Sequence, residues 1–298
     1  MKMKSRTSIV IILGISLFAA FYVLMFRYVT DIEKPFEQGN LKAQRTVYSD
    51  TARIGVVSRF TPQKIYEGYQ PIMDYLTEQT GILFELELSA TYRETLSALK
   101  EGKTLAAFLG SYIFAEENDG ELFAVLKPLA ENGKSYFRSV LIVKEQSPIF
   151  RVDDLRGKRV ALPSAEAFSG NWLQKILLKK YGLSVSDLKE IKHFDFHNSV
   201  VRQVLMGNYD AGVVKDRVAK EYSGQGIRAV IYSEPVPGSP LVISSKSDKR
   251  KVDTLISVLL AAKSPITKTW DKEFEYGFVR ASNSDYVALR KLFDGGAK

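Results

Sequence analysis

Cysteine is absent from the 298 residues of this chain, and histidine occurs only twice, as His193 and His197. Without cysteine there is no disulfide bond, no thiolate metal site, no thiol nucleophile and no lipid-modified N-terminal cysteine. Two histidines argue against a histidine-rich metal centre. The sequence also has no P-loop, no Gly-x-Ser-x-Gly motif and no Gly-x-Gly-x-x-Gly motif. We therefore expect a protein that is not an enzyme and that needs no metal and no cofactor.

A large excess of one charge sign is also absent over most of the chain. The formal net charge is +8, but Lys2, Lys4, Arg6 and Arg27 supply four of these charges with no acid among the first 27 residues, which leaves +4. In the remainder, acidic and basic residues are interspersed without a basic stripe. This pattern argues against a nucleic-acid partner. The composition, 45% hydrophobic and 26% charged without repeats, is that of a globular protein.

One long hydrophobic run is present, at residues 7–26, where twenty uncharged residues lie between basic flanks. As a helix this run spans roughly 30 Å, the thickness of the hydrocarbon core of a bilayer. Its one pair of small residues, Ala19–Ala20, follows bulky side chains that suit signal cleavage poorly. We expect an uncleaved anchor or signal, with a cleaved signal as the alternative. The basic residues 1–6 then remain cytoplasmic, and residues 27–50 form a polar linker to an extracytoplasmic, periplasmic domain.

From residue 51 onward, short apolar segments alternate with amphipathic ones, a pattern typical of an α/β fold with mostly parallel sheets. Strands are predicted at residues 54–57, 83–88, 105–109, 122–126, 140–143, 159–162, 191–196, 210–214, 229–232 and 241–243. Helices are predicted around residues 65–76, 95–100, 171–181, 199–206 and 252–262. Pro71 is expected to kink or split the first of these helices. Gly81, Gly102, Gly182 and Gly207 lie where helices end.

Ten strands are many for one sheet, and two smaller sheets fit the pattern better. Residues 138–144 and 237–244 are extended apolar runs without helices on both sides, as expected of segments that cross between two lobes. The predicted lobes are residues 51–138 with 241–298, and residues 139–240. Ligands of open α/β sheets bind beyond the carboxyl ends of the strands. Two such lobes facing each other predict a cleft that closes about a hinge.

Six blocks of this sequence carry a resemblance to a known family. They are RIGVVSRFTPQKIYEGYQPIMDYLTEQTG, ATYRETLSALKEGK, LAAFLGSY, YFRSVLIVKEQSPIFRVDDLRGKRVALPS, FHNSVVRQVLMGNYDAGVVKD and IYSEPVPGSPLVIS, within residues 53–290. In order and spacing they resemble the phosphonate, phosphite and phosphate-type substrate-binding proteins of ABC transporters. The resemblance implies a non-catalytic, two-lobed type 2 periplasmic binding protein fold with the ligand held between the lobes.

The resemblance also implies where an oxyanion binds. Family members hold the phosphonyl group on a Ser-Thr-Ser-Gly turn that opens a helix, where free N–H groups and the helix dipole favour an anion. The aligned residues here are Ala167, Phe168, Ser169 and Gly170, so two hydroxyl groups are missing. Ser169 has an alternative role as a helix N-cap. Phe168 has the alternative of filling the pocket and excluding tetrahedral oxyanions.

Other ligand contacts are implied singly by the resemblance, at Tyr92, Phe137 with the adjacent Tyr136, His197, Asp216 and Ser239. Ser111 and Tyr112, which follow a predicted strand where a helix begins, are further candidates. Each has a structural alternative. Asp216 and Ser111 suit helix caps, and the tyrosines suit packing with the hydroxyl in water. Ser239 replaces a family aspartate that meets an amino group, which argues against a cationic ligand tail.

We thus expect a membrane-tethered extracytoplasmic solute-binding protein that captures a small phosphate-, phosphite- or phosphonate-like anion and passes it to an ABC transporter permease. The alternative is a membrane-anchored sensory or scaffold module beside a sensor protein, with a degenerate site for a different ligand. Neighbouring genes for a permease and ATPase, or for a kinase, distinguish the two.

Overall fold

The computed structural model describes residues 16, 18–25, 50–131 and 133–294. The chain divides into two compact units, Met1–Val47 and Tyr48–Lys298. In the first unit, residues 16 and 18–25 are helical and exposed. Among the described residues, no helix combines the length and the apolar character that crossing a membrane requires. Apart from residues 16, 18–25 and 50, the predicted anchor and linker lie outside the described residues, so both stay predictions.

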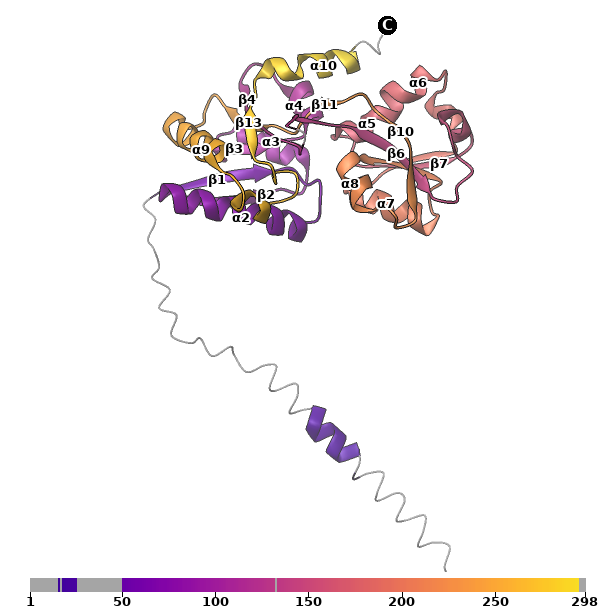
Figure 1. Ribbon diagram of the computed structural model, residues 1–298, viewed down its shortest axis with the longest axis horizontal. Coiled ribbons are helices and arrows are strands. Elements are labelled where there is room, and N and C mark those ends of the chain that lie inside the picture. Colours follow the sequence, from indigo (N-terminus) through magenta and orange to yellow (C-terminus); the bar gives the residue numbers. More distant parts are fainter. Residues whose placement is uncertain (1–15, 17, 26–49, 132, 295–298) are drawn as a thin grey trace, which may run out of the picture. The chain divides into compact units, whose positions relative to one another are not determined.

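The second unit contains two α/β lobes, each built on one sheet (Figure 1). The sheet of lobe 1 has the order β13-β4-β12-β3-β1-β2. Its strands are β1 (Thr51–Val56), β2 (Leu83–Leu88), β3 (Ala106–Phe108), β4 (Leu122–Pro128), β12 (Leu241–Ser244) and β13 (Phe278–Arg280). Its helices are α2 (Pro62–Thr80), α3 (Tyr92–Lys100), α4 (Ser111–Glu117), α9 (Lys249–Ala261), α10 (Val287–Asp294) and the short turns η4 (Ile266–Thr269) and η5 (Asn283–Tyr286).

The sheet of lobe 2 has the order β10-β6-β9-β7-β8. Its strands are β6 (Ser139–Lys144), β7 (Arg159–Leu162), β8 (Glu190–His193), β9 (Ala211–Lys215) and β10 (Ile227–Tyr232). A continuous helical stretch comprises α5 (Phe168–Trp172), the π-helical turn η2 (Leu173–Leu177) and α6 (Leu178–Lys180). The remaining helices are α7 (His197–Met206), α8 (Asp216–Glu221), η1 (Val152–Leu155) and η3 (Val185–Asp187).

A two-stranded antiparallel sheet joins the lobes where the chain passes between them. It pairs β5 (Tyr136–Phe137) with β11 (Val236–Pro237), so the two crossings lie side by side (Figure 1). The boundaries predicted at residues 138 and 240 fall beside this sheet. The two-lobed α/β fold expected from the sequence is confirmed.

The sheets are mixed, and the expectation of mostly parallel sheets is wrong. In lobe 1, β1 pairs parallel with β2 and β3, but β12 runs antiparallel to both β3 and β4. In lobe 2, β7 is parallel to β8 and β9, whereas β6 is antiparallel to β9 and β10. The reason is the crossover: β6 and β12 enter their sheets directly from the hinge instead of through a right-handed strand–helix–strand connection.

Helix α2 shows how tertiary packing overrides a local signal. It runs from Pro62 to Thr80 without a break, although Pro71 lies inside it, so of the two expected effects of Pro71 the split is wrong and the kink stays a prediction. Ile65, Tyr69, Ile72, Met73 and Leu76 bury one face of the helix. This burial offsets the single backbone hydrogen bond that proline removes. The helix ends at Gly81, which has the left-handed φ of 71° that glycine adopts without strain.

Candidate functional site

Buried charged side chains join the two lobes at the carboxyl ends of two strands. Arg59 follows β1 of lobe 1, and Lys215 is the last residue of β9 in lobe 2. Glu273, in the loop between η4 and β13, lies between them. Its Oε2 accepts a hydrogen bond from Arg59 Nη1 at 2.9 Å, and its Oε1 accepts one from Lys215 Nζ at 2.5 Å. All three side chains are more than nine-tenths buried.

The electrostatics of these three groups follow from burial and mutual attraction. Burial alone would raise the pKa of Glu273, but the surrounding cations Arg59, Lys215 and Arg217 hold it well below its usual range. Burial likewise opposes the charge of Arg59, whose pKa is nevertheless raised by Glu273 and its other neighbours. For Lys215, burial and the two arginines outweigh Glu273, and its pKa is lowered.

Arg59 has more hydrogen-bonding capacity than its neighbours use. Its Nη1 also donates to Ser239 Oγ at 3.1 Å. Its Nε and Nη2 are buried and find no acceptor among the described residues. Unpaired buried donors on a charged group are costly, so these two N–H groups are suited to an anion that enters the cleft.

A second layer of ion pairs surrounds this centre and also joins the lobes. Arg217 of α8 pairs with Asp271 at 3.0 Å and with Glu221 at 3.3 Å. Glu221 in turn pairs with Lys64 of α2 at 3.1 Å. Arg217 also has two buried nitrogens, Nε and Nη2, without a partner in the part of the chain that the structure describes.

His197, at the start of α7, is held neutral beside these cations. Its ring is buried, and its Nδ1 accepts the backbone N–H of Lys215 at 3.4 Å. Burial, reinforced by Lys215, Arg59 and Arg217, lowers the pKa of His197 to about 3. An accepting Nδ1 on a neutral ring leaves the proton on Nε2. His197 therefore offers an N–H donor rather than a charge.

Tyr92 and Ser239 approach the same centre from lobe 1. Tyr92 opens α3, is buried, and packs its ring where a side chain on Gly110 would lie. Burial raises the pKa of Tyr92 to about 12, so its hydroxyl keeps its proton. Ser239 holds Arg59, as described above. The structure thus brings together three of the residues proposed from sequence, Tyr92, His197 and Ser239, around Arg59.

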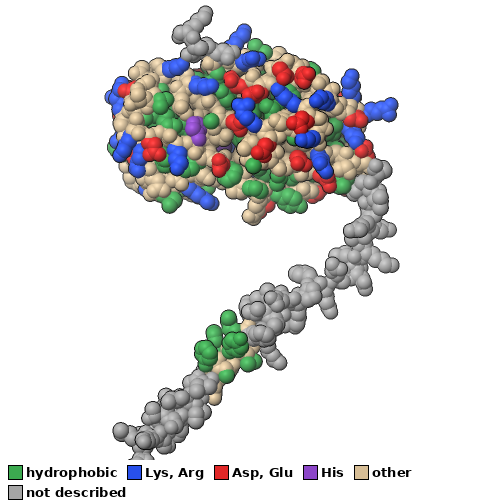
Figure 2. All heavy atoms as spheres, turned by 180° about the vertical axis from the view of Figure 1, so that it is seen from behind, with side chains coloured by type: hydrophobic (Ala, Val, Ile, Leu, Met, Phe, Trp, Pro, Cys, Tyr) green, Lys and Arg blue, Asp and Glu red, His purple; other side chains and the backbone are tan. Residues whose placement is uncertain are grey.

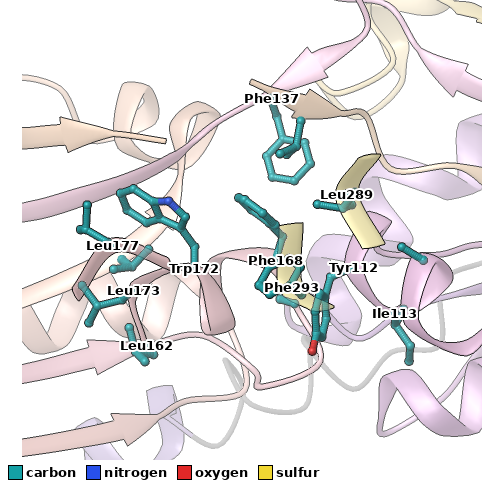
Figure 3. Close-up of a cluster of buried hydrophobic side chains, with 14 of the residues drawn as sticks. Tyr112, Ile113, Phe137, Leu162, Phe168, Trp172, Leu173, Leu177, Leu289 and Phe293 are labelled. Carbon is teal, nitrogen blue, oxygen red and sulfur yellow. The ribbon is translucent and has the colours of Figure 1, made fainter. Parts of the chain in front are cut away.

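An aromatic cluster fills the neighbouring part of the interface. Phe168 of α5 is 3% exposed and meets both Phe137 and Phe293 edge-on, each with ring centroids 5.7 Å away. Phe293 belongs to α10, which also packs on Tyr112 of α4 with centroids 4.6 Å apart. Figure 3 shows Phe168 among Phe137, Phe293 and Tyr112. A ligand contact by Phe168 and the alternative that it fills the pocket both stay predictions.

Ser169 and Gly170 follow Phe168 and are engaged within lobe 2. The hydroxyl groups of Ser169 and Ser139 are 2.6 Å apart, which ties α5 to β6. The N–H of Gly170 donates to Ala167 O at 3.1 Å. A Cβ on Gly170 would lie 2.0 Å from Ser164 O, so only glycine permits this approach of the backbone. The proposed role of their amides in holding an anion stays a prediction.

Ser111 and Tyr112 contribute contacts between segments far apart in the sequence. Ser111 Oγ donates to Pro237 O at 2.7 Å, next to the hinge. Tyr112 OH accepts a hydrogen bond from Lys175 Nζ of lobe 2 at 2.7 Å. Both side chains are buried. These contacts close the interface, and ligand contact by either residue remains a prediction.

Tyr136, Phe137 and Asp216 line a groove of about 1260 Å³ beside the hinge, together with Lys215 and Glu273. Tyr136 is 54% exposed. The ring of Phe137 lies 4.4 Å from Lys215 Nζ, a cation–π contact. Asp216 accepts the N–H of Arg138 at 2.9 Å and its carboxylate faces the N-terminus of α8. The N-cap of α8 is Lys215 and Asp216 is the first residue of the helix, so the expected helix cap at Asp216 is wrong, because its carboxylate bonds to Arg138 instead, and a ligand contact stays a prediction.

Sequence reasoning missed Arg59, Lys215 and Glu273. The first two carried a usable signal, because each is a charged residue at the carboxyl end of a predicted strand, where open α/β sheets bind ligands. Glu273 carried none, since it lies in an irregular loop.

Among the described residues, no group of three or more His, Asp or Glu is arranged to hold a metal ion. On the face seen in Figure 2, acidic and basic side chains are interspersed.

Two α/β lobes joined by a two-stranded sheet and facing each other across buried charges define a two-lobed binding protein. Residues 54–286 match the family described as ABC transporter, phosphonate, periplasmic substrate-binding protein. The chain belongs to this family. It is therefore a periplasmic substrate-binding protein of ABC transporters and not an enzyme, as the sequence predicted.

Solved structures share this fold. A binding protein component of an ABC phosphonate transporter from Pseudomonas aeruginosa has a TM-score of 0.73 at 16% identity, over 82% of this chain and 85% of that one. PhnD1 from Prochlorococcus marinus, in complex with methylphosphonate, has a TM-score of 0.74 at 13% identity, over 83% and 98%. A Xanthomonas citri protein bound to ATP has a TM-score of 0.66 at 21% identity, over 83% and 97%.

Proposed function

We propose that this protein binds a small phosphonate-, phosphite- or phosphate-like anion between its lobes, with Arg59 and Lys215 as its charge partners. The observation that carries the proposal is that Nε and Nη2 of Arg59 are buried without an acceptor among the described residues, while Lys215, a second buried cation, shares Glu273 with Arg59. Hydrogen bonds between charged partners contribute about 1.5–3 kcal/mol each. The family assignment and the methylphosphonate complex of the relative PhnD1 support the same ligand class.

The remaining donors follow from the sequence and from the position of each side chain. Tyr92 and the Nε2–H of His197 are neutral donors, suited to ligand oxygens that Arg59 does not reach. Ser169 is proposed to offer its backbone amide, whereas the N–H of Gly170 is engaged by Ala167 O within lobe 2 and must leave that bond before it can hold an anion. Ser239 orients Arg59 through its hydroxyl. Ser239 stands where the resemblance gives an aspartate that meets an amino group, which favours anions without a cationic tail.

The test is isothermal calorimetry and thermal shift on the full-length chain with phosphate, phosphite and methylphosphonate. A true ligand raises the melting temperature, because it binds only the folded state. Arg59→Gln should weaken binding by roughly 10- to 150-fold, the equivalent of one charged hydrogen bond. Arg53→Gln is the matched control, since Arg53 lies in exposed ion pairs with Glu85 and Glu87. If none of the three anions shifts the melting temperature at millimolar concentration, the proposal is wrong.

The packing of Phe168 favours the second candidate function, a sensory or scaffold module whose degenerate site binds a different ligand. With its ring between Phe137 and Phe293, the position of the family's second hydroxyl is occupied by carbon. Restoring the family pattern with Ala167→Ser and Phe168→Thr discriminates the two. A receptor already suited to oxyanions gains affinity modestly, whereas a degenerate site changes from no binding to measurable binding.

For the N-terminal segment, we infer an uncleaved anchor at residues 7–26 and a linker at residues 27–50 that hold the periplasmic domain at the inner membrane near a permease or a sensor protein. The support is the apolar run between basic flanks. N-terminal sequencing of the membrane-purified protein tests it. A mature N-terminus between residues 20 and 30 would show cleavage and overturn the anchor.

A further inference from the structure

The carboxylate of Glu273 lies between a buried cation of lobe 1 and a buried cation of lobe 2. Each of its two carboxylate oxygens bonds a cation from a different lobe, Oε2 to Arg59 and Oε1 to Lys215. A phosphonate or phosphate group presents two oxygens on one centre in the same way. The chain itself supplies a carboxylate that bridges the two cations.

The backbone around Glu273 is fixed independently of its side chain. The N–H of Asp271 donates to Gly68 O at 2.8 Å, which ties the loop to α2. Phe274 is 1% exposed and packs against Tyr69, Phe108 and Phe278. The loop therefore keeps its place when the carboxylate moves, and only side-chain rotation is required.

Room for that movement lies next to the carboxylate. Glu273 lines the groove of about 1260 Å³, together with Lys215, Arg217 and Lys272. A carboxylate that leaves Arg59 and Lys215 can turn into this groove toward Lys272, which is exposed. The cations that it leaves behind, with the unpaired nitrogens of Arg59, form a complete set of donors for an incoming anion.

We propose that Glu273 is an internal substitute for the ligand, which bridges Arg59 and Lys215 to hold the lobes closed when the cleft is empty, and which an oxyanion displaces on binding. This inference rests on the proposed function for the identity of the displacing anion. It makes Glu273 a determinant of affinity: only an anion that engages both cations better than a carboxylate replaces it. Neutral solutes and cations leave it in place.

The test measures lobe separation and affinity in the same proteins. Because the chain has no cysteine, spin labels attach only at introduced sites. Tyr66→Cys on α2 and Met206→Cys on α7 are both exposed and lie on different lobes. Pulsed electron paramagnetic resonance on the full-length chain in detergent then reports the distance between the lobes, with and without methylphosphonate.

Three variants are compared with wild type. Glu273→Gln removes the charge with little change of shape. Glu275→Gln is the matched control, two residues along the same loop and lining the same groove. Because Glu273→Gln leaves two buried cations without a counter-charge and risks misfolding, the double variant Lys215→Gln/Glu273→Gln removes the bridge while balancing charge. Circular dichroism confirms that each variant is folded.

Without ligand, wild type and Glu275→Gln should give one short distance, while Glu273→Gln and the double variant shift toward a longer one. Methylphosphonate should return Glu273→Gln to the short distance. Removal of the internal competitor should also tighten binding of methylphosphonate to Glu273→Gln by roughly tenfold or more, since no fraction of sites is then blocked.

The outcomes separate this inference from the proposed function. If Glu273→Gln and the double variant keep the wild-type distance, or if Glu273→Gln binds methylphosphonate more weakly than wild type, Glu273 is not an internal substitute for the ligand. If neither wild type nor Glu273→Gln binds any of the three anions, the proposed function and the displacement by an oxyanion both fail. A ligand-free shift in distance would in that case still establish the closing role of Glu273.

Discussion

His197 should make the stability of this protein depend on pH in a range where its carboxylates do not. The ring is neutral in the folded protein, because burial and the cations Lys215, Arg59 and Arg217 lower its pKa to about 3, against a smaller opposing effect of Glu273. In the unfolded chain a histidine has its ordinary pKa of about 6.5. Below that pH the histidine is protonated in the unfolded state but stays neutral in the folded state.

The sign and size follow from this difference. Because the pKa of His197 is lowered in the folded state, the neutral ring contributes to the free energy of unfolding. This contribution is fully present above pH ~6.5 and is lost progressively down to about pH 3. Between about pH 7 and pH 5 the loss amounts to about 2 kcal/mol, and in the steep part it approaches about 1.4 kcal/mol per pH unit. The lowered pKa of Glu273 affects stability only from its ordinary value of 4.5 downward, so the window between about pH 7 and pH 5 separates the histidine from this carboxylate.

The comparison is between wild type and His197→Asn. Asparagine keeps an oxygen near the position of Nδ1 to accept the N–H of Lys215, but it does not titrate. Urea denaturation at pH values from about 7.5 down to 4.5 gives the free energy of unfolding for both. The wild-type value should fall relative to the variant by about 2 kcal/mol between pH 7 and 5. Parallel curves for the two proteins would show that His197 titrates normally and refute the reasoning.

Three further predictions concern packing across and beside the cleft. Gly170→Ala should lower the free energy of unfolding by more than the roughly 1–3 kcal/mol usual for overpacking, because the new Cβ would lie 2.0 Å from the backbone oxygen of Ser164. An unchanged urea midpoint would contradict this. Phe168→Ala should lower the free energy of unfolding by about 3–5 kcal/mol, since the ring is almost fully buried among aromatic neighbours, and a loss below about 1 kcal/mol would mean that the ring is solvated. Arg93→Gln should lower the free energy of unfolding by at most about 1 kcal/mol. Its ion pair with Glu166 joins the lobes at 2.9 Å, but the arginine is 66% exposed. A larger loss in the same urea assay would show that this pair contributes to lobe closure.

The pattern of apolar residues along the chain predicted most of the secondary structure, because each segment has to bury one face. The strands at residues 83–88 and 159–162 coincide with β2 and β7. The glycines at positions 81 and 207 both end helices with left-handed φ. The elements not predicted include β5, β11, β13 and α10, which are short or terminal and whose hydrogen bonds or apolar contacts come from residues distant in the sequence.

The site could be predicted only in part. Tyr92, His197 and Ser239 were proposed from the resemblance, and they lie around Arg59. Ser111, Ser169 and Asp216 instead bond to Pro237, Ser139 and Arg138, protein groups that no spacing along the chain identifies as their partners.

The sequence by itself determined the α/β class, the two lobes and the family, since periodicity, turn residues and motif order are properties of neighbouring positions. Only the tertiary structure decided what fills the space between the lobes. The carboxylate of Glu273 meets Arg59 and Lys215 across 214 and 58 positions of chain, and Phe168 meets Phe293 at the other end of the domain. Contacts at such separations depend on the folded path of the whole backbone, because charge and ring packing act through space and not along the chain.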